Sequence, residues 1–159
     1  MLSCLLGLRQ PKLDNDTRAF FRDARPWGFI LFREACVTRE QVRALCAELR
    51  QSVDRDATVW IDQEGGRVAR LKAPEWPVWP AAGKFGEIYA KDKKAGREAA
   101  YLGYRLIAHE LRSIGVDGVL SRPFDQMLGT AGGTTLHDMA HGVWERAVLP
   151  IGCGVLSLV

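Results

Sequence analysis

One stretch of the chain, residues 58–71, combines charged side chains and glycines in a pattern suited to a ligand site. A short apolar run, Val59–Ile61, ends at two carboxylates, two glycines and two arginines, which are Asp62, Glu64, Gly65, Gly66, Arg67 and Arg70. In α/β proteins, ligand-binding residues lie just beyond the C-terminal ends of buried parallel strands. Paired glycines let the backbone turn tightly and approach a ligand. The pattern predicts a binding site, and the alternative is a charged surface loop after a core strand.

The elements that position this stretch alternate between apolar and helical segments, which predicts an α/β protein with a parallel sheet. The expected strands are Leu2–Leu8, Trp27–Phe32, Thr58–Ile61 and Gly118–Ser121. The expected helices are Thr17–Ala24, Thr38 to about Ser52, and Lys91–Ile114. Residues 72–90 are expected to be irregular, with Trp76 and Trp79 either stacking on a ligand or holding the loop in place.

Helical spacing predicts which side chains face the core. The first helix is expected to use Ala19 and Phe20. The second, which opens with the capping-box pair Thr38 and Gln41, is expected to use Val42, Leu45, Cys46 and Leu49. The third is expected to use Ala95, Ala99, Leu102, Leu106 and Leu111, and to end at Gly115.

Composition and charge exclude several function classes. The net charge of +3 is small and its charges are interspersed, so no nucleic-acid partner is expected. The cysteines show no CxxC pair or dense framework, which is typical of reduced thiols in a cytoplasmic protein. No run approaches the roughly 18 apolar residues of a membrane helix. We therefore expect a cytoplasmic protein without a membrane partner.

The segment Asp62–Val68 reads Asp-Gln-Glu-Gly-Gly-Arg-Val. It resembles the sugar-binding signature of glycoside hydrolase family 3, in particular the cytoplasmic β-N-acetylhexosaminidases of peptidoglycan recycling. The resemblance extends from about Leu6 to Asp125. It implies a partial (β/α)₈ TIM barrel, roughly the first four β/α units, because a complete barrel needs about 250 residues and the chain has 159. Residues 1–125 are thus expected to be the N-terminal part of the family's barrel.

The same resemblance implies roles for two residues. Asp62 resembles the family aspartate that accepts hydrogen bonds from sugar hydroxyls, and Arg70 resembles the arginine that reaches the same sugar. The implied substrate is terminal N-acetylglucosamine on a muropeptide or chitooligosaccharide, with no cofactor and no metal. Glu64 and Arg67 are interpreted as an internal pair that shapes the loop, and the role of Asp125 stays open.

The resemblance stops after Asp125. Family members carry a Lys-His with a nearby Pro-Gly-His-Gly, an Asp-x-His acid/base loop and a later aspartate nucleophile, and this sequence contains none of these motifs. A retaining glycosidase needs two carboxyl groups, so we identify no catalytic residue and expect a sugar-binding part that is inactive alone. Residues 126–159 are interpreted as a divergent tail, truncated or frame-shifted, with a helix at Thr135–Ala147 and a strand at Ile151–Val159. An uncovered sheet edge would favour self-association.

Two alternative functions stay open. One is a noncatalytic sugar-binding domain that uses Asp62 and Arg70 alone. The other is a metal-binding module, because His137, His141 and Glu145 fall on one helical face, although the glutamate of a zinc-protease helix is absent. A flavodoxin-like fold also fits the β/α order. Gly65–Gly66 lacks the neighbours of a phosphate-binding loop, however, so no cofactor is expected.

Overall fold

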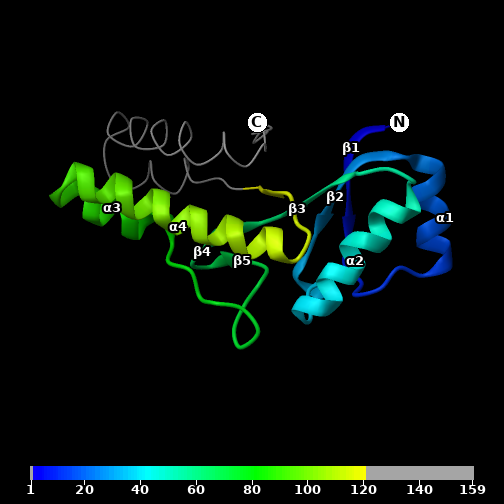
Figure 1. Cartoon of the computed structure of the whole chain (residues 1–159), viewed down its shortest axis with the longest axis horizontal. Coiled ribbons are helices and arrows are strands. Elements are labelled where there is room, and N and C mark those ends of the chain that lie inside the picture. Colours follow the sequence, from blue (N-terminus) through cyan, green and yellow to red (C-terminus); the bar gives the residue numbers. More distant parts are fainter. Residues whose placement is uncertain (1, 121–159) are drawn as a thin grey trace.

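Four parallel strands form the sheet that organises the fold (Figure 1). The computed structural model describes residues 2–120. The strands are β1 (Leu2–Leu8), β2 (Pro26–Leu31), β3 (Thr58–Ile61) and β6 (Gly118–Val119). They lie side by side in their order along the chain, as consecutive strands of a (β/α)₈ barrel do. The predicted α/β class is confirmed, and the flavodoxin-like alternative, which needs the strand order 2-1-3, is wrong.

Strand register gives the sheet two distinct faces, because successive side chains of a strand alternate between them. Leu6 pairs with Phe29, which pairs with Val59, and these side chains lie on the face that the first two helices cover. One residue further along each strand, Gly7, Ile30 and Trp60 share the opposite face, which we call the inner face. The predicted strands are thus confirmed to within one residue, up to Ser121, which lies outside the described residues.

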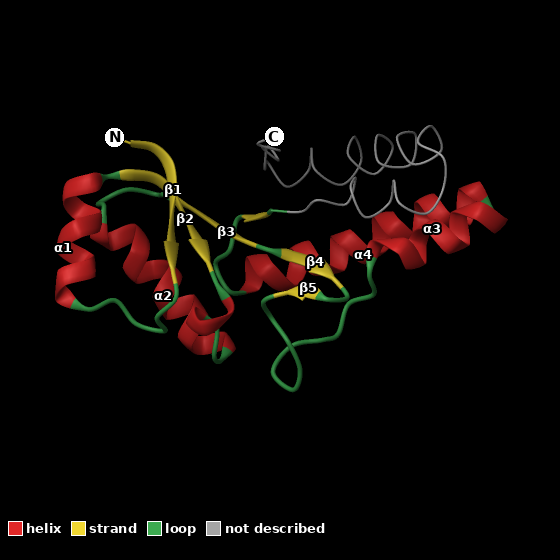
Figure 2. Ribbon diagram, turned by 180° about the vertical axis from the view of Figure 1, so that it is seen from behind, coloured by secondary structure: helices red, strands yellow, loops and turns green. Residues whose placement is uncertain are grey.

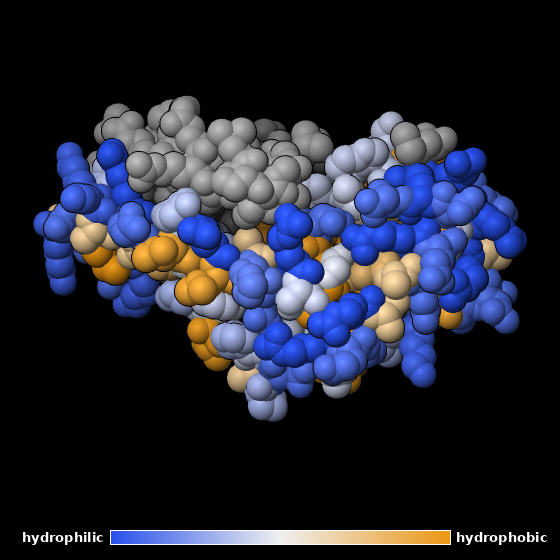
Figure 3. All heavy atoms as spheres, in the orientation of Figure 1, coloured by the Kyte–Doolittle hydropathy of each residue, from blue (hydrophilic) through white to orange (hydrophobic). Residues whose placement is uncertain are grey.

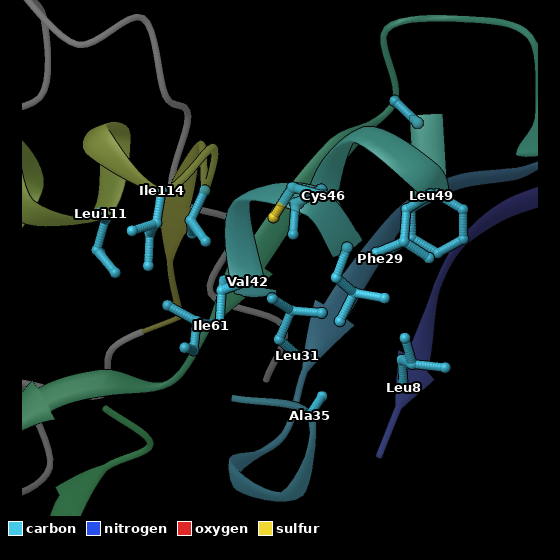
Figure 4. Close-up of a cluster of buried hydrophobic side chains, with 14 of the residues drawn as sticks. Leu8, Phe29, Leu31, Ala35, Val42, Cys46, Leu49, Ile61, Leu111 and Ile114 are labelled. Carbon is cyan, nitrogen blue, oxygen red and sulfur yellow. The ribbon is translucent and has the colours of Figure 1, made fainter. Parts of the chain in front are cut away.

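Two helices cover the other face of the sheet. They are α1 (Asn15–Ala24) and α2 (Arg39–Ser52), and a single 3₁₀ turn, η1 (Arg33–Ala35), precedes α2. The hydroxyl of Thr38 accepts from the amide of Gln41 at 3.2 Å, which confirms the predicted cap. Figure 4 shows the resulting core, in which strand side chains meet the face of α2. All four predicted α2 contacts are buried: Val42, Leu45, Cys46 and Leu49.

The inward face of α1 differs from the prediction by one position. Phe20 is 57% exposed, whereas Phe21 is 3% exposed and its ring centroid lies 4.9 Å from that of Phe29. The helix begins at Asn15, capped by Asp14, two residues earlier than predicted. Because Phe20 and Phe21 are adjacent, the helical pattern alone does not determine which of them faces the sheet. In the structure Phe21 does so, since its ring packs against Phe29.

The prediction of an irregular segment over residues 72–90 is wrong in its second half. Residues Ala82–Lys91 form a helix, α3, which packs against α4 (Lys93–Ser113) (Figure 1). The start of α3 has no side-chain cap, and two glycines, Gly83 and Gly86, lower its intrinsic helix propensity. Packing of Phe85 and Tyr89 onto α4 overrides that weak local preference.

The buried face of α4 is also different from the predicted one. Ala95, Leu102 and Leu106 are exposed and Ala99 is half-buried, so of the predicted contacts only Leu111 is buried. The buried residues are instead Gly96, Ala100, Ile107 and Leu111. A Cβ atom on Gly96 would lie 2.4 Å from the Cα of Tyr89, so the small residues of α4 form the contact with α3. The prediction was based on the spacing of the leucines and did not consider the face formed by the small residues.

The surface view shows where apolar side chains remain at the surface (Figure 3). Hydrophilic residues dominate this face, and apolar residues gather over α3 and α4, where Ile88, Leu102 and Leu106 are exposed. Within residues 2–120 no helix combines the length and apolarity required to cross a bilayer. The described cysteines, Cys4, Cys36 and Cys46, carry free thiols.

Candidate functional site

The candidate site lies at the C-terminal edge of the sheet, where β3 ends. Asp62 follows the last residue of β3 directly, and the chain then forms a small antiparallel hairpin of β4 (Gln63–Gly65) and β5 (Val68–Ala69). The hairpin and the long loop that follows it are seen in Figure 2, beside α4. The amide of Arg70 donates to the carbonyl of Asp62 at 3.2 Å, which returns the chain to the strand end. The hairpin thus brings Arg70 back to Asp62.

Two glycines make the hairpin turn possible. Gly65 and Gly66 have φ angles of 89° and 59°, in the left-handed region that other residues rarely adopt. A Cβ atom on Gly65 would lie 2.2 Å from the carbonyl oxygen of Pro80, and the amide of Gly66 donates to the carbonyl of Trp79 at 2.9 Å. The predicted tight turn is therefore confirmed, and the backbone that it approaches is the protein's own loop.

A buried glutamine, Gln63, holds the open end of the hairpin, where β4 begins and β5 ends. Its side-chain oxygen accepts from the amides of Arg70 at 2.9 Å and Leu71 at 3.1 Å. Its side-chain nitrogen donates to the carbonyl of Leu71 at 3.3 Å. The side chain is only 1% exposed, so these bonds form away from water. Sequence reasoning passed over Gln63, although it stands inside the motif.

Asp62 and Arg70, the two predicted substrate-binding residues, are in direct contact. Nη2 of Arg70 lies 2.5 Å from Oδ2 of Asp62, and the two side chains are 33% and 23% exposed. The contact has one point, meaning that Arg70 donates to Oδ2 of Asp62 alone. No described residue donates to Oδ1. Both side chains are thus partly open to solvent, with a carboxylate beside a guanidinium.

Phe32 and Arg9 extend the site along the sheet edge. Phe32 follows β2, and its ring fills the space left by Gly7 on the inner face. The guanidinium carbon of Arg9 lies 4.3 Å from the centroid of the Phe32 ring, and that of Arg70 lies 5.9 Å from it. Arg9 also contacts Glu34 at 3.4 Å in an exposed ion pair. Neither Arg9 nor Phe32 was predicted, because only the sheet order places β1 and β2 ends beside Asp62.

The remaining residues of interest have different positions. Glu64 is buried and Arg67 is exposed, and their pairing stays a prediction. Trp76 is buried in the core and Trp79 packs against it, which favours the loop-holding role over ligand stacking. Asp125 and the possible metal ligands His137, His141 and Glu145 lie outside the described residues. Residues 2–120 contain no group of three or more metal-ligating side chains.

Two known proteins with similar sequences carry the same name. β-Hexosaminidases from Xanthomonas axonopodis and Xylella fastidiosa are both 34% identical to the chain over 113 residues, which is 71% of this chain. A glycoside hydrolase family 3 β-N-acetylglucosaminidase from Paenibacillus is 30% identical, with a TM-score of 0.63 over 74% of this chain and 22% of its own. The chain belongs to glycoside hydrolase family 3. No model of a protein family matches it.

The solved structures extend this family 3 assignment to the fold. NagZ from Neisseria gonorrhoeae, crystallised with a zinc ion, matches with a TM-score of 0.83 and 23% identity, over 92% of this chain and 47% of its own. NagZ crystallised with N-trifluoroacetyl-D-glucosamine matches with a TM-score of 0.80. The chain spans about a third of the length of the curated relatives it matches, 34% in the first case. It corresponds to the N-terminal part of a family 3 β-N-acetylhexosaminidase.

Proposed function

We propose that this chain forms the sugar-binding part of a β-N-acetylhexosaminidase site, with Asp62 and Arg70 holding a terminal N-acetylglucosamine. The observation that carries the proposal is the one-point contact between the two side chains at the C-terminal edge of the sheet. The names of the relatives and the sugar analogue bound to NagZ support the choice of sugar. The substrates would be muropeptides or chitooligosaccharides.

The geometry suggests how each group contributes to binding. Oδ1 of Asp62, which no described residue donates to, would accept from a sugar hydroxyl. Arg70 would donate to a neighbouring oxygen of the same sugar, since a guanidinium carries more donors than one carboxylate oxygen can use. A charge-assisted hydrogen bond of this kind is about twice as strong as a neutral one. The pair therefore supplies an acceptor and donors to adjacent ring positions.

We further propose that the isolated chain binds the sugar without hydrolysing it. Retaining hydrolysis requires a nucleophile and an acid/base group on either side of the glycosidic bond. The motifs that carry these groups in the family are absent from this sequence. Asp62 is assigned to binding, so it is not available as either group.

Titration of the chain with N-acetylglucosamine, followed by NMR or calorimetry, tests the proposal together with an assay on a chromogenic N-acetylglucosaminide. We expect saturable sugar binding and no release of the chromophore. Absence of binding in a folded chain would contradict the sugar-site assignment. Release of the chromophore at an enzymatic rate would contradict only the claim that the chain is inactive alone.

A further inference from the structure

We propose that Gln63 is a positioning residue of the sugar site, whose buried amide sets Arg70 opposite Asp62. The inference rests on the proposed function, because it assumes that Asp62 and Arg70 bind the sugar. Gln63 would not touch the ligand. It would act through the backbone of the residue that does.

The hydrogen bonds of Gln63 converge on one short segment. The backbone amides of Arg70 and Leu71 both donate to its side-chain oxygen, and the carbonyl of Leu71 accepts from its side-chain nitrogen. The amide of Arg70 also lies 3.2 Å from the carbonyl of Asp62, so it is held between two acceptors. No water competes for these groups, since the Gln63 side chain is buried. The backbone from which the Arg70 side chain starts is therefore fixed.

This position couples Gln63 to both ends of the ion pair. Gln63 follows Asp62 in the chain, and its hydrogen bonds end on Arg70 and the next residue. Without them, the backbone contacts of the return strand that remain in the described part of the chain are the two ladder pairings of β4 with β5 and the bond from Arg70 to Asp62. The side-chain contact of Arg70 with Asp62 would then rest on a less fixed backbone. The Arg70 guanidinium would then sample other positions, and sugar binding would have to restore its order, which weakens affinity.

The chain offers a matched control in Gln41. Its side-chain oxygen accepts from the amide of Val37 at 2.9 Å, and its nitrogen donates to the carbonyls of Pro11 and Ala35. Gln41 thus fixes the loops at the start of α2 by the same chemistry, and none of its hydrogen bonds ends on Asp62 or Arg70. Gln63→Met and Gln41→Met each remove an amide with three hydrogen bonds at nearly constant volume, the first buried and the second half-buried.

Sugar affinity and thermal stability of both variants separate positioning from general destabilisation. We expect both variants to melt at a lower temperature than the unsubstituted chain. At a temperature where all are folded, Gln63→Met should bind N-acetylglucosamine on the order of tenfold more weakly, and Gln41→Met with unchanged affinity. Equal affinities for all three chains, or equal losses in both variants, would overturn the proposal.

Gln63→Glu provides a rescue within one variant. A protonated carboxyl can copy the glutamine, because its hydroxyl donates to the carbonyl of Leu71 while its other oxygen accepts both amides. An ionised carboxylate has no donor and faces that carbonyl with a negative charge. Relative to the unsubstituted chain at the same pH, the affinity of Gln63→Glu should therefore rise as the pH falls. A ratio that does not change with pH would count against Gln63.

Amide hydrogen exchange, measured by NMR without sugar, keeps the two proposals distinguishable. In folded Gln63→Met we expect faster exchange at Arg70 and Leu71 than in Gln41→Met. If this occurs in a chain that binds no sugar, the proposed function fails while the positioning of Arg70 by Gln63 stands. Unchanged exchange at both amides would overturn the positioning role. If Gln63→Met does not fold, Gln63→Glu supplies the comparison, because relative to the unsubstituted chain at the same pH both amides should exchange faster when its carboxyl is ionised than when it is protonated.

Discussion

At the scale of single residues, the important feature of the Asp62–Arg70 pair is that one hydrogen bond joins the two side chains rather than two. A guanidinium and a carboxylate often form two parallel hydrogen bonds, which occupy both carboxylate oxygens. Here Arg70 reaches only Oδ2 of Asp62. Under the proposed function, this contact holds the pair in place and leaves the second carboxylate oxygen to accept from the sugar.

The substitution Asp62→Asn tests this view directly. It removes the charge and one acceptor at nearly constant volume, and a hydrogen bond to a charged group contributes about 1.5–3 kcal/mol. We expect the dissociation constant for N-acetylglucosamine to rise about 10- to 150-fold. Calorimetric titration measures it, with Asp23→Asn, an exposed residue of α1, as the control. Equal affinities for the two variants would remove Asp62 from the site.

The buried thiol of Cys46 should make stability depend on alkaline pH. Burial raises the pKa of Cys46 from 9.0 to about 12. Between these values the unfolded chain has lost the proton and the folded chain retains it, so stability falls as the pH rises, by about 1.4 kcal/mol per pH unit for a fully shifted thiol.

Denaturant unfolding between pH 8 and the alkaline limit of stability measures this slope, with pH values chosen around the ordinary pKa of 9.0. Cys46→Ala should lower stability at every pH but reduce the slope. Cys36→Ala should also reduce the slope, because burial raises the pKa of that thiol from 9.0 to about 12 as well. The same slope in Cys46→Ala and the unsubstituted chain would show that other groups cause the pH dependence.

The sequence pointed to a candidate site but not to Gln63. Charged residues beside paired glycines at a strand end indicated a site within residues 58–71, and the resemblance to family 3 singled out Asp62 and Arg70, whose roles stay predictions. The role of Gln63 depends on its burial and on a return strand that brings Arg70 and Leu71 to it. Neither condition is visible in residue types. Phe32 and Arg9 were not predicted for the same reason, because the order of the strands in the sheet brings these two residues close to each other.

At the scale of elements, the α3–α4 pair depends on small residues of α4. Gly96 and Gly103 lie against Tyr89 and Phe85 of α3, with Ala100 buried between them. Spaced four and three residues apart, these small residues let the two helices approach closely. The spacing of these small residues is visible in the sequence. The prediction was based on the periodicity of large apolar residues, however, and so chose Leu102 and Leu106, which are exposed.

Alanine at two glycines should have opposite effects on this pair. Gly96→Ala places a Cβ atom 2.4 Å from the Cα of Tyr89, and such overpacking costs about 1–3 kcal/mol. Gly86→Ala meets no atom within 4 Å and should stabilise α3 by about 0.5–1 kcal/mol. Urea unfolding monitored by circular dichroism compares the two. Stabilisation by Gly96→Ala would show that the helices do not approach as described.

At the scale of the whole molecule, the sheet is open in the part of the chain that the structure describes. β1 and β6 stand at its two ends, and each has a strand neighbour on one side only among residues 2–120. A strand with unpaired amides and carbonyls can pair with another chain. Such pairing provides a route to self-association.

We predict concentration-dependent association that a charge on β1 reduces. Lysine on an edge strand opposes pairing between chains, so Ser3→Lys, at an exposed position of β1, should shift the chain toward monomer. Sedimentation velocity over a wide range of protein concentrations measures the shift. Gln51→Lys, an exposed position of α2, adds the same charge elsewhere and should have no effect. A monomer at all concentrations would contradict the prediction.

The sequential order of the strands also bears on how the chain folds during synthesis. Each strand pairs with the one made before it, so β2 can join β1, and β3 can join β2, as soon as each leaves the ribosome. These pairings join Leu8 to Leu31 and Leu31 to Ile61, which are closer in the chain than Ile61 and Val119, the partners of the last pairing. Contacts between residues that are closer in sequence tend to form earlier. The pairing of β6 with β3 must wait for α3 and α4. Asp62, Gln63 and Arg70 precede both helices, so the hairpin can close around Gln63 before the last strand arrives.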